Sequence, residues 1–255
     1  MTSIFDTSQF NRNLFFPRPD TKHSPQGEVE DIFIPVEDSV RIHVRRHLIP
    51  QPRFSLLFFH GNGEIVSDYD DFAEIYGQMG AQLTVCDYRG YGQSDGDPTL
   101  RNTLEDAGKV FVALREQGKL LPDICVMGRS LGSAPAIELC STQTEIKAGV
   151  IESGYADPVP LVERRGLRID KTTPEEDALF NNSEKIKKVT CPLLILHGED
   201  DTLIYPHEAE LNYRQAGSKD KALQILDGVG HNDIMMAPDG GYFKCLHRFF
   251  DKVFS

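Results

Sequence analysis

Apolar runs separated by amphipathic stretches recur along most of this chain. Residues 54–59 and 191–196 are apolar at nearly every position, which is typical of strands buried on both faces of a parallel sheet. We expect strands to end near His60, Asp87, Gly128, Glu152, His197 and Asp227, and helices to span 68–79, 100–117, 131–140, 207–215 and 242–253. Strands that alternate with helices predict an α/β fold with a doubly wound, mostly parallel sheet.

The N-terminal region follows a different pattern. Residues 31–36 and 40–47 alternate between polar and apolar positions on either side of a short polar turn. This alternation predicts an antiparallel hairpin. Residues 1–30 are rich in proline and asparagine, and we expect them to form an irregular arm that wraps the domain.

The alternation of strands and helices also stops after Glu152. The next strand begins roughly forty residues later, and a connection of that length is typical of lids and binding loops. We therefore predict a single domain over residues 1–255 with a small cap inserted at 153–190. A short helix is expected in the cap at 173–180, because Pro174 suits a first helical turn.

The segment Gly128-Arg129-Ser130-Leu131-Gly132 lies between a predicted strand and a predicted helix. A chain that turns this tightly brings the residues two before and two after the apex together, and glycine at both positions removes the collision. The hydroxyl of Ser130 would then project above the sheet, with the N–H of Leu131 facing the same space. This arrangement is that of a nucleophile.

A nucleophilic serine needs donors for an oxyanion, a base and an acid that orients the base. The turn His60-Gly61-Asn62-Gly63 follows a buried strand, so the N–H of Asn62 could pair with that of Leu131 as an oxyanion hole. His231 lies in a glycine-flanked loop after the last predicted strand and is the candidate base.

The sequence pattern alone does not decide which carboxylate orients the histidine. Asp200 and Asp201 both follow a strand that ends beside the serine, and Glu152 ends the preceding strand. Each of these carboxylates could face the histidine. We expect His60 and His197 to have structural roles, with His60 shaping the oxyanion turn by hydrogen bonding.

Taken together, these motifs resemble α/β-hydrolase fold serine hydrolases, and in particular the small cytosolic hydrolases grouped with the serine aminopeptidase-like and Bem46-like proteins. The motifs that carry the resemblance span residues 58–233 and include His60-Gly61-Asn62-Gly63, the stretch from Asp87 to Ser94, Gly128-Arg129-Ser130-Leu131-Gly132, His197-Gly198-Glu199-Asp200-Asp201 and Gly230-His231-Asn232-Asp233. The resemblance implies that Ser130 is the nucleophile, Asp201 the acid and His231 the base. Asp200 would then cap a turn.

These parts predict a cofactor-independent serine hydrolase that forms an acyl-enzyme on Ser130. The cap holds few apolar side chains, so we expect a carboxylesterase that acts on short-chain or small polar esters. A thioesterase or a peptidase of the same fold is the nearby alternative, and a non-catalytic ligand-binding or scaffold protein of this fold is the alternative of another class. Three cap arginines, Arg164, Arg165 and Arg168, could form a solvated charged face or bind an acidic substrate group.

The amino-acid composition limits the kinds of molecule that this protein is expected to bind. The formal net charge of −12 and the absence of a basic run argue against nucleic acid and anionic membranes, which leaves a small-molecule acyl substrate. The five cysteines lie mostly in apolar segments, and no signal-peptide core or membrane-spanning run is visible, so we expect a cytoplasmic protein. The eight histidines lack close ligand spacing, and therefore we expect neither a metal nor a cofactor.

Overall fold

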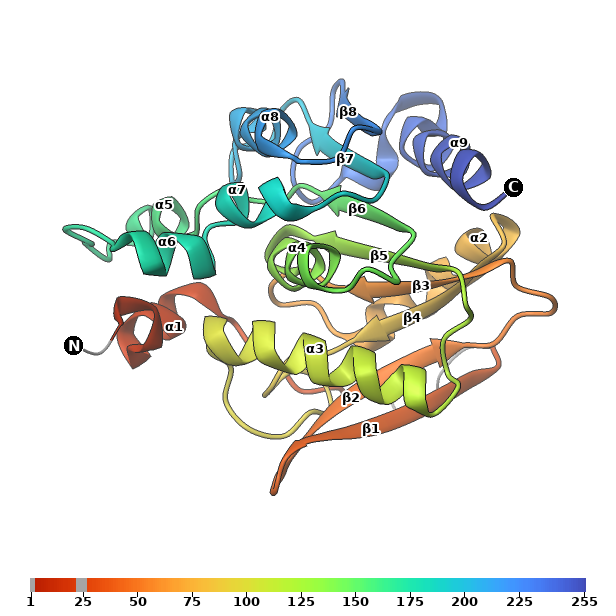
Figure 1. The fold of residues 1–255 in the computed structure, drawn as a ribbon, viewed down its shortest axis with the longest axis horizontal. Helices are drawn as coiled ribbons and strands as arrows, with labels where there is room; N and C mark the ends of the chain where they lie inside the picture. The colour runs from red at the N-terminus through yellow and green to blue at the C-terminus, as the bar shows by residue number, and fades with distance from the viewer. Residues whose placement is uncertain (1–2, 22–26) are drawn as a thin grey trace.

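A twisted sheet forms the centre of this computed structural model, which describes residues 3–21 and 27–255 (Figure 1). In the described part of the chain the sheet has eight strands in the order β1-β2-β4-β3-β5-β6-β7-β8. The strands are β1 (Val29–Glu37), β2 (Val40–His47), β3 (Phe54–Phe59), β4 (Ala81–Cys86), β5 (Ile124–Arg129), β6 (Ala148–Glu152), β7 (Leu193–Gly198) and β8 (Lys221–Leu226). From β4 to β8 all neighbouring strands are parallel, whereas β2 pairs antiparallel with both β1 and β4. The mostly parallel sheet and the N-terminal hairpin are confirmed.

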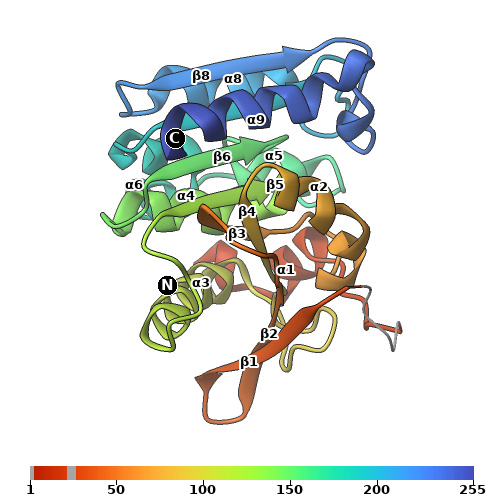
Figure 2. The same ribbon diagram turned by 90° about the vertical axis from the view of Figure 1, so that its right-hand side faces the viewer.

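Helices cover both faces of the sheet. The helices are α1 (Ser8–Leu14), α2 (Ala73–Gln78), α3 (Leu100–Glu116), α4 (Ser133–Thr142), α5 (Pro158–Glu163), α6 (Pro174–Phe180), α7 (Asn182–Lys185), α8 (Pro206–Gln215) and α9 (Gly241–Phe254). Side chains of α3, α4 and α8 join one buried apolar cluster, and those of α2 and α9 join another on the opposite face. Figure 2 shows α2 and α9 together in front of the strands.

The central strand β3 shows why an apolar run becomes a buried strand. Leu57 and Phe59 point into the cluster formed with α3 and α4, whereas Leu56 and Phe58 point into the cluster formed with α2 and α9. All four side chains are almost completely inaccessible to solvent. Alternate residues therefore serve opposite faces, and both faces need apolar side chains.

The predicted helix boundaries are less accurate than the predicted strands. The expected helix over 68–79 is correct in its second half, where Ala73–Gln78 is α-helical, but its first half lies in a 3₁₀ helix, Val66–Phe72. Helix α4 is preceded by a 3₁₀ turn at Ser130–Gly132. The short helix expected at 173–180 is confirmed, since α6 begins at Pro174 after Thr173, whose side chain accepts the N–H of Glu176.

The prediction of an irregular N-terminal arm is wrong for residues 4–14. Ile4–Asp6 forms a 3₁₀ helix and Ser8–Leu14 forms α1, which begins where the Thr7 hydroxyl accepts the Phe10 N–H at 3.2 Å. The prediction for residues 1–2 and 22–26 lies outside the described residues. The arm forms helices because Phe5 and Phe10 are fully buried, with the Phe5 ring stacked on Phe180 at 4.3 Å.

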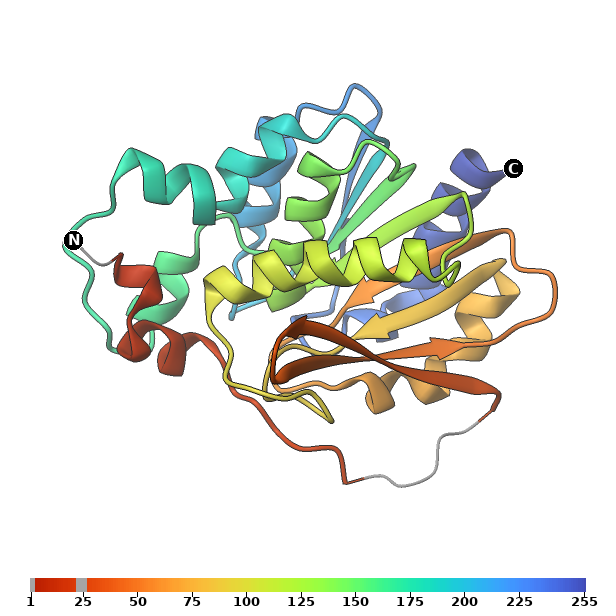
Figure 3. The same cartoon turned by 60° about the horizontal axis from the view of Figure 1, so that its bottom comes forward.

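Helix α1 lies beside α5 at one end of the strands (Figures 1 and 3), and Phe5, which precedes α1, contacts α6 through Phe180. Residues 153–190, which connect β6 to β7, include α5, α6 and α7. We propose that this segment is the predicted cap within a single domain, and that the N-terminal arm packs against it. Within the described part of the chain, no helix has both the length and the hydropathy needed to cross a membrane.

Candidate active site

The turn after β5 holds Ser130 in an unusual backbone conformation. Its φ angle is 52°, in the left-handed region that non-glycine residues rarely occupy. A Cβ on Gly128 would lie 2.1 Å from the Gly132 carbonyl oxygen, and a Cβ on Gly132 would lie 2.0 Å from that of Phe59. Neither glycine can therefore be replaced without moving backbone. The contact of Gly128 with Gly132 is the one that the predicted turn requires, whereas Gly132 is limited by the neighbouring strand β3.

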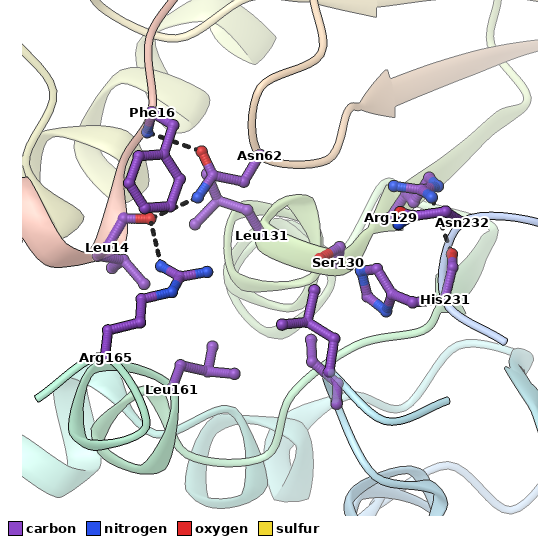
Figure 4. A pocket seen from close by; sticks show the side chains of 12 residues that line it. Leu14, Phe16, Asn62, Arg129, Ser130, Leu131, Leu161, Arg165, His231 and Asn232 are labelled. Carbon is purple, nitrogen blue, oxygen red and sulfur yellow. Dashed lines mark hydrogen bonds between the residues drawn. The ribbon is translucent and has the colours of Figure 1, made fainter. Parts of the chain in front are cut away.

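The structure brings Ser130, His231 and Asp201 together, although more than 100 positions separate the serine from the histidine. His231 Nε2 lies 2.8 Å from Ser130 Oγ, and His231 Nδ1 lies 2.7 Å from Asp201 Oδ2. All three residues are at least nine-tenths buried. Figure 4 shows the imidazole of His231 beside Ser130.

Asp201 accepts hydrogen bonds from backbone N–H groups as well as contacting His231. Its Oδ1 accepts the backbone N–H groups of Leu203 at 2.9 Å and Ile204 at 2.8 Å. Burial, the largest single influence, raises the pKa of Asp201, but hydrogen bonds from His197 and His231 more than offset it and hold that pKa well below its usual range. The carboxylate is therefore ionised and fixed in orientation.

The other two candidate acids have different partners. The side chain of Asp200 is exposed, and its backbone N–H donates to the Val229 carbonyl at 3.0 Å. Glu152 is fully buried, where its Oε2 accepts the Tyr242 hydroxyl at 2.6 Å and its Oε1 lies 3.1 Å from Arg129 Nε. Of these three carboxylates, Asp201 is the one within hydrogen-bond distance of His231.

The turn after β3 faces the serine. Asn62 and Leu131, whose backbone N–H groups were predicted to form an oxyanion hole, line the same pocket as Ser130. The Asn62 side chain is engaged elsewhere: its Oδ1 accepts the Phe16 N–H at 2.8 Å and its Nδ2 donates to the Leu14 carbonyl at 2.5 Å (Figure 4). The oxyanion role of the two N–H groups stays a prediction.

His60 and His197 have the contacts of structural histidines. His60 Nδ1 lies 2.8 Å from the Gly61 carbonyl oxygen, and its Nε2 lies 3.2 Å from Asp87 Oδ1. His197 Nε2 lies 2.8 Å from the Ile204 carbonyl oxygen and 3.2 Å from Asp201 Oδ2. His197 therefore supports the acid loop.

Arg129 is a residue at this site that the sequence analysis missed. It is buried behind the serine, and its Nη2 donates to the His231 carbonyl at 2.9 Å while its Nη1 pairs with Glu64. Glu64 Oε2 in turn accepts the Gly61 N–H at 2.7 Å. Arg129 thus links the histidine loop to the turn after β3. In the sequence, Arg129 is a charged residue at the end of an apolar strand, and this pattern could have marked it as a candidate site residue.

The pocket beside Ser130 has a volume of about 240 Å³. Its walls come from the turn after β3, the turn Gly128–Gly132, the segment 153–190, the loops that carry Asp201 and His231, and the N-terminal arm. The lining residues are Leu14, Phe16, Asn62, Arg129, Ser130, Leu131, Leu161, Arg165, Leu203, Ile204, His231 and Asn232. The contribution of Leu14 and Phe16 was not predicted. Among the described residues, no cluster of three or more His, Cys, Asp or Glu side chains is placed to hold a metal ion.

Comparison with known proteins identifies the family. A family model described as serine aminopeptidase, S33 matches residues 50–165 and 160–236. The chain belongs to this family of α/β hydrolases. Human alpha/beta hydrolase domain-containing protein 17B is 31% identical over 210 residues, which cover 78% of this chain and 67% of that protein. The mouse protein 17C is 31% identical over 208 residues, which cover 78% of this chain and 60% of that protein.

Solved structures agree on the fold of this hydrolase. An esterase from Pyrococcus furiosus superimposes with a TM-score of 0.78 at 20% identity, over 94% of this chain and 100% of that one. Est1E from Butyrivibrio proteoclasticus, solved with ferulic acid bound, superimposes with a TM-score of 0.70 at 18% identity, over 87% of this chain and 98% of that one. The α/β-hydrolase fold predicted from the motifs is therefore confirmed.

Proposed function

We propose that this α/β hydrolase is a serine carboxylesterase that acts on short-chain or small polar esters. The observation that carries the proposal is the hydrogen-bonded series Asp201–His231–Ser130, with the serine on a strained turn that opens into a pocket. In this proposal Ser130 is the nucleophile, His231 the base and Asp201 the acid. The substrate is a small acyl compound, with no cofactor, nucleic acid or membrane partner, and the protein is cytoplasmic.

The geometry suits a two-step acyl transfer. His231 Nε2 takes the proton of Ser130 Oγ as the oxygen bonds to the acyl carbon, and Asp201 stabilises the imidazolium through Nδ1–H. The N–H groups of Asn62 and Leu131 would donate to the oxyanion. The tetrahedral intermediate collapses when the leaving alcohol accepts the proton from His231. Water, activated by the same ring, then attacks the acyl-enzyme, and the carboxylic acid leaves while Ser130 regains its proton.

The preference for short acyl groups rests on the pocket. Its volume of about 240 Å³ is below the range of about 300–1,000 Å³ typical of clefts for drug-sized ligands. Asn62, Arg165 and Asn232 contribute polar groups to the lining. Each additional CH₂ gains about 0.8 kcal/mol only where it is buried, and this pocket offers a long chain little burial.

Turnover of a substrate panel tests the proposal. We expect kcat/KM to be highest for nitrophenyl acetate to butyrate, lower for decanoate, and lower still for matched thioester and aminoacyl anilide substrates. A value that rises steadily towards decanoate would contradict the short-chain preference. Higher values for the thioester or the anilide would favour the alternative thioesterase or peptidase. The absence of any turnover would favour a binding protein of this fold.

A further inference from the structure

The three arginines of the cap have different surroundings in the structure. Arg165 lines the pocket beside Ser130, whereas Arg164 and Arg168 do not. Arg164 Nη2 pairs with Glu208 at 3.0 Å, and Arg168 is exposed. Figure 4 shows the Arg165 guanidinium reaching up from the α5 side towards Leu14, across the pocket from Ser130.

The contacts of Arg165 satisfy only part of its guanidinium. Nη1 donates to the carbonyl oxygens of Asn13 at 2.5 Å and Leu14 at 3.4 Å. The guanidinium carbon lies 4.7 Å from the centre of the Phe16 ring, within the distance of a cation–π contact. Within residues 3–21 and 27–255, neither Nε nor Nη2 has a hydrogen-bond partner, and no carboxylate forms an ion pair with Arg165.

This positive charge is not compensated inside the pocket. No aspartate or glutamate is among the described lining residues, and the other lining arginine, Arg129, is paired with Glu64 and Glu152. Burial lowers the pKa of Arg165, Tyr91 raises it and Arg164 lowers it further. Arg165 is partly buried, and a partly buried cation that lacks a counter-ion gains from a ligand that supplies one.

The free edge of Arg165 suits a planar anion. Nε and Nη2 lie on one side of a guanidinium and match the two oxygens of a carboxylate. The same chain shows this geometry elsewhere, because Arg89 Nε and Nη2 donate to the two carboxylate oxygens of Asp106 at 2.6 and 2.9 Å.

We propose that Arg165 binds a carboxylate of the substrate, so that the enzyme prefers esters that carry a negative charge near the scissile bond. This inference rests on the proposed esterase activity and specifies its substrate class. The N-terminal arm takes part, because the carbonyl groups of Asn13 and Leu14 hold the guanidinium in the pocket.

Two matched pairs of esters test the inference on either side of the scissile bond. In the first pair, 4-(butanoyloxy)benzoate and 4-(butanoyloxy)benzamide differ by a carboxylate against an amide in the leaving group. In the second pair, monomethyl glutarate and methyl glutaramate differ in the same way in the acyl group. The measured quantity is the ratio of kcat/KM for the carboxylate to that for the amide within each pair.

We expect the wild-type ratio to exceed one in at least one pair and to fall about 10- to 100-fold in Arg165→Gln, as loss of a charge-assisted hydrogen-bonded pair predicts. Arg165→Lys should retain part of the ratio. Arg168→Gln, at an exposed position outside the pocket, should keep the wild-type ratio and is the matched control. A ratio unchanged by Arg165→Gln in both pairs, or an equal fall for both members of each pair, would overturn the inference.

A labelling experiment decides the question if none of the four esters is hydrolysed. Glutarate should slow the reaction of Ser130 with a fluorophosphonate in wild-type protein more than glutaramide does, and Arg165→Gln should remove the difference. Equal labelling rates with the two compounds in wild-type protein would overturn the inference and leave the proposed nucleophile intact. Failure of Ser130 to react at all would instead refute the proposed function.

Discussion

Replacing Asp201 by asparagine should disable the candidate site through the tautomer of His231. Asp201 Oδ1 accepts two backbone N–H groups, from Leu203 and Ile204. An asparagine keeps those two hydrogen bonds only if its carbonyl oxygen occupies the Oδ1 position. Its NH₂ group then faces His231 Nδ1, which must become an acceptor.

The consequence follows from the chemistry of imidazole. A neutral ring that accepts at Nδ1 carries its proton on Nε2, the atom 2.8 Å from Ser130 Oγ. That nitrogen cannot then accept the serine proton. The same substitution in a Ser-His-Asp triad costs about 10⁴ in kcat, and at 1.36 kcal/mol per tenfold this is about 5.4 kcal/mol of transition-state stabilisation. The opposite orientation of the amide would set two N–H donors against its NH₂ group and sacrifice both hydrogen bonds.

The assay is kcat/KM on nitrophenyl butyrate, with thermal unfolding followed by circular dichroism to verify the fold. Asp200→Asn and Glu152→Gln are the matched controls, because neither side chain contacts His231. Asp200→Asn, at an exposed position, should retain activity within about tenfold of wild type. Glu152→Gln removes a buried charge that faces Arg129, and should still lose much less activity than Asp201→Asn. Two results would refute the reasoning. One is a folded Asp201→Asn variant with activity within tenfold of wild type, and the other is a larger loss in Glu152→Gln.

Two further predictions concern the fold around the site. Gly132→Ala should lower the free energy of unfolding in urea by about 3 kcal/mol or more and abolish turnover, because its Cβ would meet the Phe59 carbonyl oxygen at 2.0 Å; a wild-type urea midpoint would contradict this. The buried His43–Asp87 pair should make the melting temperature depend on pH. Burial lowers the pKa of His43 and raises that of Asp87, but hydrogen bonds reverse both shifts, so the His43 pKa is raised and the Asp87 pKa lowered. The stability that the pair contributes should therefore be full between about pH 4 and 6.5, and should fall below that range as Asp87 gains a proton and above it as His43 loses one. His43→Gln should remove the alkaline decline, and a melting temperature that falls from pH 6 to 9 as steeply in this variant as in the wild type would count against the assignment.

Features set by neighbouring residues could be predicted from the sequence. Gly128 avoids a collision with the backbone of Gly132, four residues further on, so the motif itself reveals the turn. Gly132 is required for a different reason, the close approach of the Phe59 carbonyl on β3, which the motif does not show. The buried strands follow from apolar runs that both faces of a parallel sheet require. Because parallel strands end at one edge of the sheet, Ser130 and Asp201 could be placed near each other without coordinates.

Features set by distant partners could not be predicted. The N-terminal helices depend on the contact of Phe5 with Phe180, which is 175 positions away. Likewise, nothing local distinguishes Arg164 from Arg165, because the difference is that Glu208 lies beside one of them. The role of Arg129 depends on partners in three separate loops or strands, of which the motif shows none.

The most direct test of the central claim is fluorophosphonate labelling of wild-type and Ser130→Ala protein, followed by intact mass and peptide mapping. The account predicts one adduct on wild-type protein, located on Ser130, and no adduct on a Ser130→Ala variant that melts at the wild-type temperature. Labelling of the variant at the wild-type rate, or an adduct on another residue of the wild-type protein, would contradict the claim that Ser130 is the nucleophile.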